Sequence, residues 1–175
     1  MFEFNTEERV ENNSYLFKNF SNYIDIVSRY NKKSNLLVDI HAFCLMPNHY
    51  HLLLSPRIKD GVSKFMQKVN IGYAMYFNKK YERKGTLFES RFKPILIDNQ
   101  AYFTYIPFYI HLNPLDFKYK EWRDHKLTDY HGAMDFLNSY KWSSHLDYCG
   151  GNKFSYLLQK ELLNELLGGP VGYQK

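Results

Sequence analysis

The chain has little cysteine and no long apolar run, and these absences exclude several classes of protein. Its 175 residues include only two cysteines, Cys44 and Cys149, which are too far apart in sequence to form a paired metal-ligand or redox motif. A reduced, cytoplasmic protein is the simplest interpretation. No apolar stretch reaches the roughly 18 residues that cross a bilayer, so we expect no membrane partner. The acidic start, with Glu3, Glu7 and Glu8, lacks the pattern of a signal peptide.

Internal repeats, low-complexity tracts and long Pro/Gly/Ser linkers are also missing from the sequence. A chain of this length can bury a core without disulfides. We therefore expect one domain over residues 1–150, followed by a C-terminal helix and tail over residues 151–175.

The charge of the chain is mildly positive, with a formal net charge of +5 and a pI near 9.0. This total alone says little about partners. Its distribution is more informative, because six basic and only two acidic residues lie between Lys79 and Lys93. This stretch predicts a phosphate-binding surface. The 16 tyrosines and 14 phenylalanines could stack on unpaired bases, but most of them fall at core spacing.

Apolar periodicity predicts alternating strands and helices in the first half of the chain. We expect a helix capped by Ser21, then a strand over residues 36–46 and, after the turn Pro47-Asn48, a second strand over residues 49–55. Asp60-Gly61 opens the clearest helix. Its apolar face contains Val62, Phe65, Met66, Val69, Tyr73, Tyr76 and Phe77.

Further elements are predicted in the second half. Residues 87–97 have the pattern of a long strand, and Asp98 or Asn99 can cap a helix that continues through Tyr109. Pro107 should kink or divide this helix, and Pro114 should end it at Asn113. Residues 160–167 form an amphipathic helix, and we expect a frayed tail after it.

These elements favour an α+β fold. The connection between the strands at residues 36–46 and 49–55 is too short for a parallel crossover, which indicates an antiparallel sheet. We expect the helices to pack mainly on one face of that sheet.

The sharpest local motif is His49-Tyr50-His51. Alternate residues of a strand point to the same side, so both imidazoles can reach one metal ion, while Tyr50, Leu52 and Leu54 face the core. The same pattern also occurs among ordinary polar strand residues. A convincing metal site requires a third ligand.

Tyr109 and Asn113 supply a second candidate pair. Residues four apart on a helix share one face, so Tyr109 could act as a nucleophile while the Asn113 amide oxygen coordinates the ion. Alternatively, Tyr109 continues the spacing of Tyr102 and Tyr105 and is simply a core residue.

Four ordered segments resemble one family. The strings CLMPNHYHLLL at residues 44–54 and YIHLNP at residues 109–114 look like the two signature segments of the single-tyrosine HUH transposases, the IS200-like enzymes, and in particular their REP-associated branch. GTLFESRFK at residues 85–93 and WSSH at residues 142–145 resemble the same family.

This resemblance implies a specific site and fold. His49 and His51 would be the metal-binding pair, Asn113 the third protein ligand and Tyr109 the nucleophile. The fold would be a ferredoxin-like or RRM-like antiparallel sheet, and the substrate single-stranded DNA with a hairpin nearby. The residues expected to contact the DNA are Arg83, Lys84, Arg91 and Lys93.

The implied chemistry is cleavage and rejoining of DNA through a 5′-phosphotyrosine. A free tyrosine is mostly protonated at neutral pH, so an ion that lowers the barrier is expected. Mg²⁺ or Mn²⁺ is the expected cofactor, although imidazole ligands also accept Zn²⁺ or Co²⁺. The protein would act as a monomer or a homodimer.

Two other functions remain open. A water-activating metal hydrolase could use a His-X-His strand, but such barrels need about 250 residues and further ligands. A non-catalytic, domesticated nucleic-acid-binding protein of the same fold would keep the basic stretch without needing the site.

The remaining histidines are expected to be structural or exposed. His41 has a structural interpretation, and His111 points away from Tyr109 on its helix. We expect three to be solvated or capping residues, namely His125, His131 and His145. Trp122 and Trp142 are interpreted as packing anchors.

Overall fold

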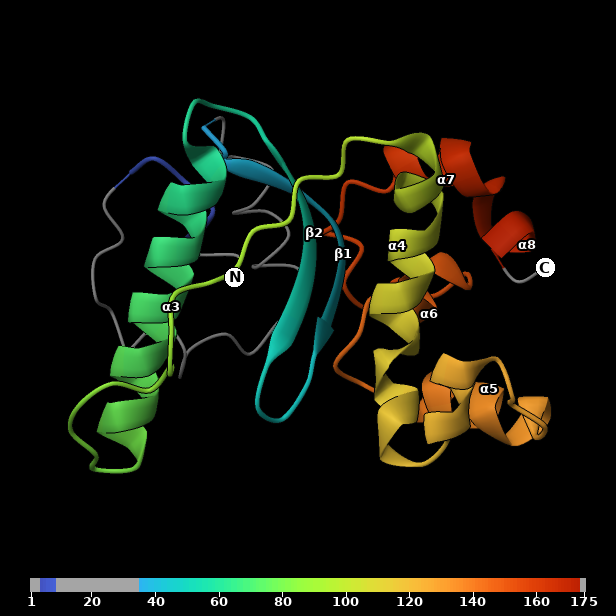
Figure 1. Ribbon diagram of the computed structural model, residues 1–175. Helices are drawn as coiled ribbons and strands as arrows, with labels where there is room; N and C mark the ends of the chain where they lie inside the picture. Colours follow the sequence, from blue (N-terminus) through green and yellow to red (C-terminus); the bar gives the residue numbers. More distant parts are fainter. Residues whose placement is uncertain (1–3, 9–34, 174–175) are drawn as a thin grey trace. The chain divides into compact units, whose positions relative to one another are not determined.

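The computed structural model describes residues 4–8 and 35–173 of the chain. The helix expected after Ser21 lies outside these residues. The chain divides into two compact units (Figure 1). Unit 1 comprises residues 1–39 and 55–95, and unit 2 comprises residues 40–54 and 96–175.

A β-hairpin contributes to both units and carries the His-X-His motif. Strand β1 runs over Val38–Leu45 and strand β2 over Tyr50–Pro56. Pro47-Asn48 forms the turn, across which the Met46 amide donates to the His49 carbonyl oxygen at 2.8 Å. The two strands pair as neighbours in one sheet, which confirms the prediction for this region.

Unit 1 is organised by helix α3, Gly61–Lys80. A side chain at Gly61 would clash with the Leu37 carbonyl oxygen, so the start of the helix lies directly against the chain that enters β1. Phe65 and Met66 are buried as expected. Farther along the predicted apolar face, Tyr73 and Tyr76 are exposed, so only its N-terminal half is core.

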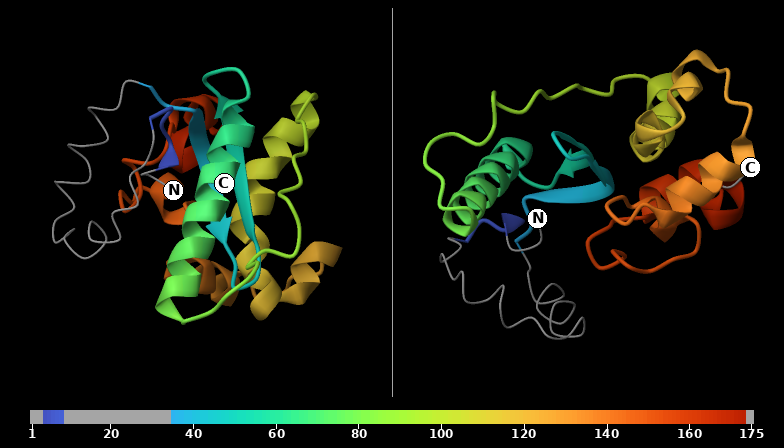
Figure 2. Two further views of the ribbon diagram at one scale, coloured as in Figure 1. Left: turned by 90° about the vertical axis from the view of Figure 1, so that its left-hand side faces the viewer. Right: turned by 90° about the horizontal axis from the view of Figure 1, so that it is seen from below.

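The strand expected over residues 87–97 is absent, and this prediction was wrong. The segment that follows α3 and precedes residue 100 contains neither strand nor regular helix (Figure 2). Ile95 is 72% and Leu96 is 83% exposed. β-branched and apolar composition favours a strand only where a neighbouring strand accepts its backbone hydrogen bonds. None of the described residues supplies such a neighbour here.

Helix α4, Gln100–Leu112, is the central helix of unit 2. The Asn99 side chain caps it by accepting from the Tyr102 amide at 2.8 Å, as predicted. Pro107 lies inside the helix without dividing it. Pro114 lacks an amide donor, and the helix gives way to the 3-10 helix η2, Asn113–Phe117.

A small core holds the turns that follow α4. The 3-10 helix η3, Lys120–Asp124, comes next, and then helix α5, Tyr130–Ser139. The core that joins them consists of Leu115, Tyr119, Ala133 and Leu137, with Trp122 partly buried against it. It fixes the two 3-10 helices close to the end of α4.

The described residues after 160 form two helices, so the frayed tail expected directly after residue 167 was wrong as far as residue 173. Helix α7 covers Glu161–Leu167 and helix α8 covers Gly169–Tyr173. Gly168, at φ 72°, ends α7 in the left-handed conformation that glycine adopts without strain. Tyr173 is only 8% exposed, so the end of α8 is part of the core of unit 2.

His145 and Trp142 also differ from expectation. His145 begins helix α6, His145–Tyr148, and is 3% exposed instead of solvated. Trp142 is 61% exposed, so it is not the buried packing anchor that was expected. The backbone of Trp142 nevertheless contacts the end of β1, because its carbonyl oxygen accepts a hydrogen bond from the Leu45 amide at 2.8 Å.

The antiparallel hairpin together with the helices gives the α+β arrangement that was expected. Among the helices of the described residues, none has the length and hydropathy needed to span a bilayer.

Candidate active site

The hairpin turn of unit 2 brings two imidazoles together. His49 lies exposed just before β2, and His51 lies within it. Their ring centroids are 5.0 Å apart, which confirms that the two side chains share one side of the strand. The Nδ1 atom of His49 is 2.7 Å from the Asn48 side-chain oxygen, and this contact orients the exposed ring.

The prediction that Tyr50, Leu52 and Leu54 form the core-facing side of β2 was wrong. Leu53 is the buried residue of the strand, at 5% exposure, and it has the same parity as His51. Tyr50, Leu52 and Leu54 are only half-buried. The side of β2 that carries His51 is therefore also the side that packs into the core, through Leu53.

His51 carries an unsatisfied polar atom. Its Nε2 atom is buried and has no hydrogen-bond partner among the described residues. An unpaired buried polar group costs about 1–3 kcal/mol. Burial lowers the pKa of His51 from its ordinary value of 6.5, and the charges of His49 and Arg123 act in the same direction, whereas Asp116 and the neighbouring Asn113 side chain oppose them more weakly. The ring is thus held in its neutral form, which is the form that binds metals.

Helix α4 presents Tyr109 and Asn113 to this histidine. The Tyr109 and His51 rings meet edge to face, with centroids 5.6 Å apart. Asn113 is buried at 1% exposure, and its Nδ2 group donates to the Tyr109 carbonyl oxygen at 2.6 Å. The structure therefore brings together the two histidines, the tyrosine and the asparagine that the sequence singled out.

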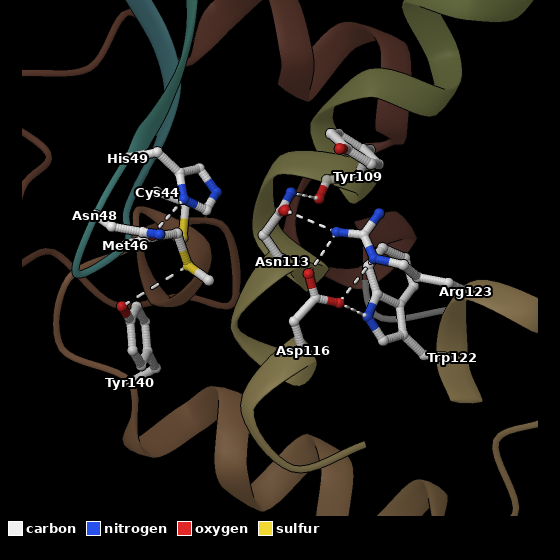
Figure 3. Close-up of polar contacts among 10 residues, drawn as sticks. All are labelled: Cys44, Met46, Asn48, His49, Tyr109, Asn113, Asp116, Trp122, Arg123 and Tyr140. Carbon is white, nitrogen blue, oxygen red and sulfur yellow. Dashed lines mark hydrogen bonds and ion pairs between the residues drawn. The ribbon is translucent and has the colours of Figure 1, made fainter. Parts of the chain in front are cut away.

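Three further residues complete the site, and sequence patterns did not reveal their role. Arg123 forms an ion pair with Asp116, in which Nη2 and Oδ2 are 2.5 Å apart. The Asp116 Oδ1 atom also accepts from the Trp122 indole at 2.7 Å (Figure 3). The hydrogen bond from Arg123 holds the pKa of Asp116 below its usual value.

Only the fold of η2 and η3 brings these three side chains to α4. Asp116 and Arg123 are seven residues apart and lie on different 3-10 helices. Their spacing equals two turns of an α-helix, but no single helix contains both residues, so the helical period does not explain their contact. An acidic residue three positions after Asn113 was the only available signal, and it is too common to be specific.

The donor set fits a divalent ion. The described residues contain no group of three or more His, Cys, Asp or Glu side chains that could hold a metal, so the Asn113 amide would be needed as a third ligand. Its Oδ1 atom already accepts from Arg123 Nη2 at 3.2 Å, but an amide oxygen has a second lone pair. The unpartnered Nε2 atom of His51 is the strongest sign of a missing partner.

The basic residues expected to contact DNA lie in unit 1. All four are exposed, namely Arg83, Lys84, Arg91 and Lys93. The Arg83 guanidinium lies 5.5 Å from the centre of the Phe77 ring. Exposure is compatible with a role in binding, and that role stays a prediction.

A second cluster of histidine and tyrosine occupies the interior of unit 2. His111 is fully buried, and its Nδ1 atom lies 2.6 Å from the Tyr173 hydroxyl. Its Nε2 atom lies 2.7 Å from the Ser144 hydroxyl. His145 Nδ1 shares the same Tyr173 hydroxyl at 3.1 Å. Burial lowers the pKa of His111 to about 3 and that of His145 to about 4.

A histidine pair at the start of a strand, one member of which contacts a tyrosine on a helix, is the arrangement expected for the class that the sequence resembles. The family model described as transposase IS200 like matches residues 12–113, which is more than half of the chain. The chain therefore belongs to the IS200-like transposase family, as the resemblance implied. The match ends at Asn113, the last of the four predicted site residues. No curated protein and no solved structure matches the chain.

Proposed function

We propose that this transposase cuts and rejoins single-stranded DNA through a covalent bond between Tyr109 and a 5′ phosphate. The observation that carries the proposal is the contact between Tyr109 and His51. The two rings are 5.6 Å apart, and the buried Nε2 atom of His51 has no partner in the described part of the chain. A tyrosine in a purely structural site does not require an unsatisfied imidazole beside it.

The proposed reaction exchanges one phosphate ester for another. The Tyr109 oxygen attacks the scissile phosphorus and gives its proton to solvent, and the bond from phosphorus to the 3′ oxygen breaks as that oxygen takes up a proton. The released strand carries a 3′ hydroxyl, and the other strand end remains on Tyr109 as a phosphotyrosine. Because the ester bond energy is kept, a 3′ hydroxyl can reverse the step and join strands without ATP.

The site residues divide this work. His49, His51 and Asn113 would hold a divalent ion, Mg²⁺ or Mn²⁺. When bound, such an ion supplies polarisation of the scissile phosphate. The hydrogen bond from Asn113 to the Tyr109 carbonyl oxygen ties the third ligand to the nucleophile, since Tyr109 lies on the last turn of α4 and Asn113 caps its end.

The proposed substrate is single-stranded DNA that carries a hairpin. The exposed basic residues of unit 1 would contact the backbone of the strand, namely Arg83, Lys84, Arg91 and Lys93. The complex would contain a monomer or a homodimer, and sedimentation with the DNA distinguishes the two.

Covalent capture tests the proposal. The protein is incubated with Mn²⁺ and a single-stranded DNA library that has random sequence flanking a fixed hairpin. Denaturation-resistant protein-DNA adducts are then isolated and sequenced. We expect the wild-type protein to form an adduct whose DNA maps to Tyr109 by peptide mass. A selected oligonucleotide then serves as the defined substrate.

Tyr105 provides a matched control for Tyr109. It lies one turn earlier on α4, with its ring 6.0 Å from that of Tyr109. Tyr109→Phe should abolish the adduct and keep DNA binding, and Tyr105→Phe should keep both. Binding without an adduct from the wild-type protein would favour a non-catalytic binding protein. Cleavage without covalent attachment would favour a water-activating hydrolase. Either result would overturn the proposal.

A further inference from the structure

Arg123 is a charged residue of the site to which the proposed chemistry assigns no task. Its guanidinium carbon lies 5.5 Å from the centre of the Tyr109 ring and 4.8 Å from that of Trp122. The same group donates to the amide oxygen of Asn113 at 3.2 Å. A cation therefore contacts both the proposed nucleophile and a proposed metal ligand.

The guanidinium is held along one edge. Nε donates to Asp116 Oδ1 at 2.8 Å, and Nη2 donates to Asp116 Oδ2 and to Asn113. These bonds use Nε and Nη2 and leave Nη1 outside them. Figure 3 shows this remaining nitrogen on the side of the Tyr109 ring. A planar guanidinium fixed along one edge presents its remaining N–H donors in a set direction.

The position of Arg123 suits an anionic ligand. Its side chain is 42% exposed, so a substrate can reach it. The hydrogen bonds that Arg123 donates to Asp116 raise the pKa of the guanidinium, so the group stays charged. Its neighbours Trp122 and Tyr109 restrict its motion, which reduces the entropy lost when it binds.

A purely structural purpose explains this arrangement poorly. An exposed ion pair contributes about 0–1 kcal/mol to stability. The ion pair of Arg57 and Asp39 in unit 1 is a suitable comparison. The Arg57 and Asp39 side chains are 41% and 21% exposed, and the Arg57 Nε atom lies 2.6 Å from Asp39 Oδ1. That pair forms one hydrogen bond, whereas Arg123 contacts four side chains of the site.

We propose that Arg123 binds the scissile phosphate through its Nη1 edge, and that Asp116 positions it for this contact. The inference rests on the proposed function, because the phosphate is the one that Tyr109 attacks. Negative charge grows on the non-bridging oxygens as the new ester bond forms and the 3′ oxygen leaves. Arg123 keeps its proton throughout and stabilises this charge by donating hydrogen bonds.

Kinetics on a neutral substrate analogue test this role. A methylphosphonate at the scissile position of the selected oligonucleotide replaces one charged oxygen by a methyl group. On the ordinary phosphodiester, Arg123→Gln should form adduct on the order of 100-fold more slowly than the wild type. On the methylphosphonate this deficit should shrink to about tenfold or less, because little charge remains for the cation to stabilise. An equal deficit on both substrates would overturn the proposal.

Three variants separate this role from a structural one. Arg57→Gln removes the same charge and a similar ion pair, and it should leave the rate within about twofold on both substrates. Asp116→Asn should slow adduct formation roughly tenfold on the phosphodiester, and its deficit relative to the wild type should be smaller on the methylphosphonate. Arg123→Lys keeps the charge without the planar edge and should fall between wild type and Arg123→Gln. Thermal unfolding of each variant shows that the fold is intact.

The binding of a phosphate by Arg123 can be measured independently of the covalent step. In ¹⁵N-arginine spectra of the full chain, the side-chain signal that is missing from Arg123→Gln identifies Arg123. That signal should shift with the dinucleotide d(TpT) and stay unchanged with its methylphosphonate analogue. If the wild type forms no adduct but the signal shifts, the proposed function fails and the phosphate site stands. If adduct forms but the signal never shifts, the inference about Arg123 fails alone.

Discussion

The two sides of helix α4 carry similar residues that are arranged in opposite ways. Tyr109 faces His51 on one side, and His111, two residues later, faces Tyr173 and Ser144 inside unit 2. Both sides pair an imidazole with a phenol. The ring nitrogens of His111 are both satisfied, whereas the buried Nε2 atom of His51 has no partner among the described residues.

This difference separates a structural histidine from a functional one. A buried polar group that is fully paired stabilises a unique fold, and it can be kept for that reason alone. An unpaired one costs stability, so it persists where another requirement retains it. The predictions below test whether the two clusters divide stability and activity in this way.

The largest effect is expected at the unsatisfied histidine. His51→Ala should lower the rate of adduct formation by on the order of 1,000-fold, because a proposed metal ligand is lost. Its melting temperature should stay the same or rise, since no hydrogen bond to Nε2 is broken. His131→Ala, at a highly exposed position, is the control for both measurements. A large loss of stability with normal adduct formation would assign His51 to the structural class.

The acid sensitivity of folding should come next in size. The folded-state pKa values of His111 and His145 are lowered to about 3 and about 4, while the unfolded chain titrates near 6.5. Between these values the unfolded state binds more protons, so stability is complete above pH 6.5 and decreases as the pH falls. Urea unfolding should show a loss of about 4 kcal/mol between pH 7 and pH 5.

Histidine variants show which residues cause this pH dependence. His111→Leu should reduce the loss by about half. His125→Gln should leave it unchanged, because that side chain is exposed. If His111→Leu keeps the full pH dependence, the interior cluster is not its source.

The smallest of the three effects is expected at the hydroxyl that joins the interior histidines. Tyr173→Phe removes the shared partner of His111 Nδ1 and His145 Nδ1. It should cost about 2 kcal/mol of unfolding free energy and leave adduct formation within about threefold. Tyr130→Phe, at a residue that is 66% exposed, should change neither. If Tyr173→Phe strongly reduced adduct formation without loss of stability, the interior cluster would have a role in activity and the proposed division would be wrong.

Local sequence signals predicted the elements that depend on neighbours in the chain. The hairpin around Pro47-Asn48, the start of α3 at Gly61, the Asn99 cap and the end of α4 before Pro114 all agree with the structure. These features are decided within a few residues, by φ restriction, capping and apolar period. The domain boundary at residue 150 stays a prediction.

The failures share a cause. Residues 87–97 have the composition of a strand but lack a neighbouring strand in the described structure. His145 was predicted to be solvated and the residues after 167 to be frayed. Both His145 and Tyr173 are buried instead, and the hydrogen bond between them satisfies their polar atoms. In both cases the outcome depends on a partner far away in the sequence.

The same division holds for the site. Local patterns were enough to predict that His49 and His51 share one side and that Tyr109 and Asn113 share another, because the strand and helix periods are local properties of the backbone. Packing between distant segments brings the two pairs together, leaves Nε2 of His51 without a partner among the described residues, and lets Asp116 hold Arg123 against Tyr109. Those contacts join residues with no common period, so packing alone could bring them together.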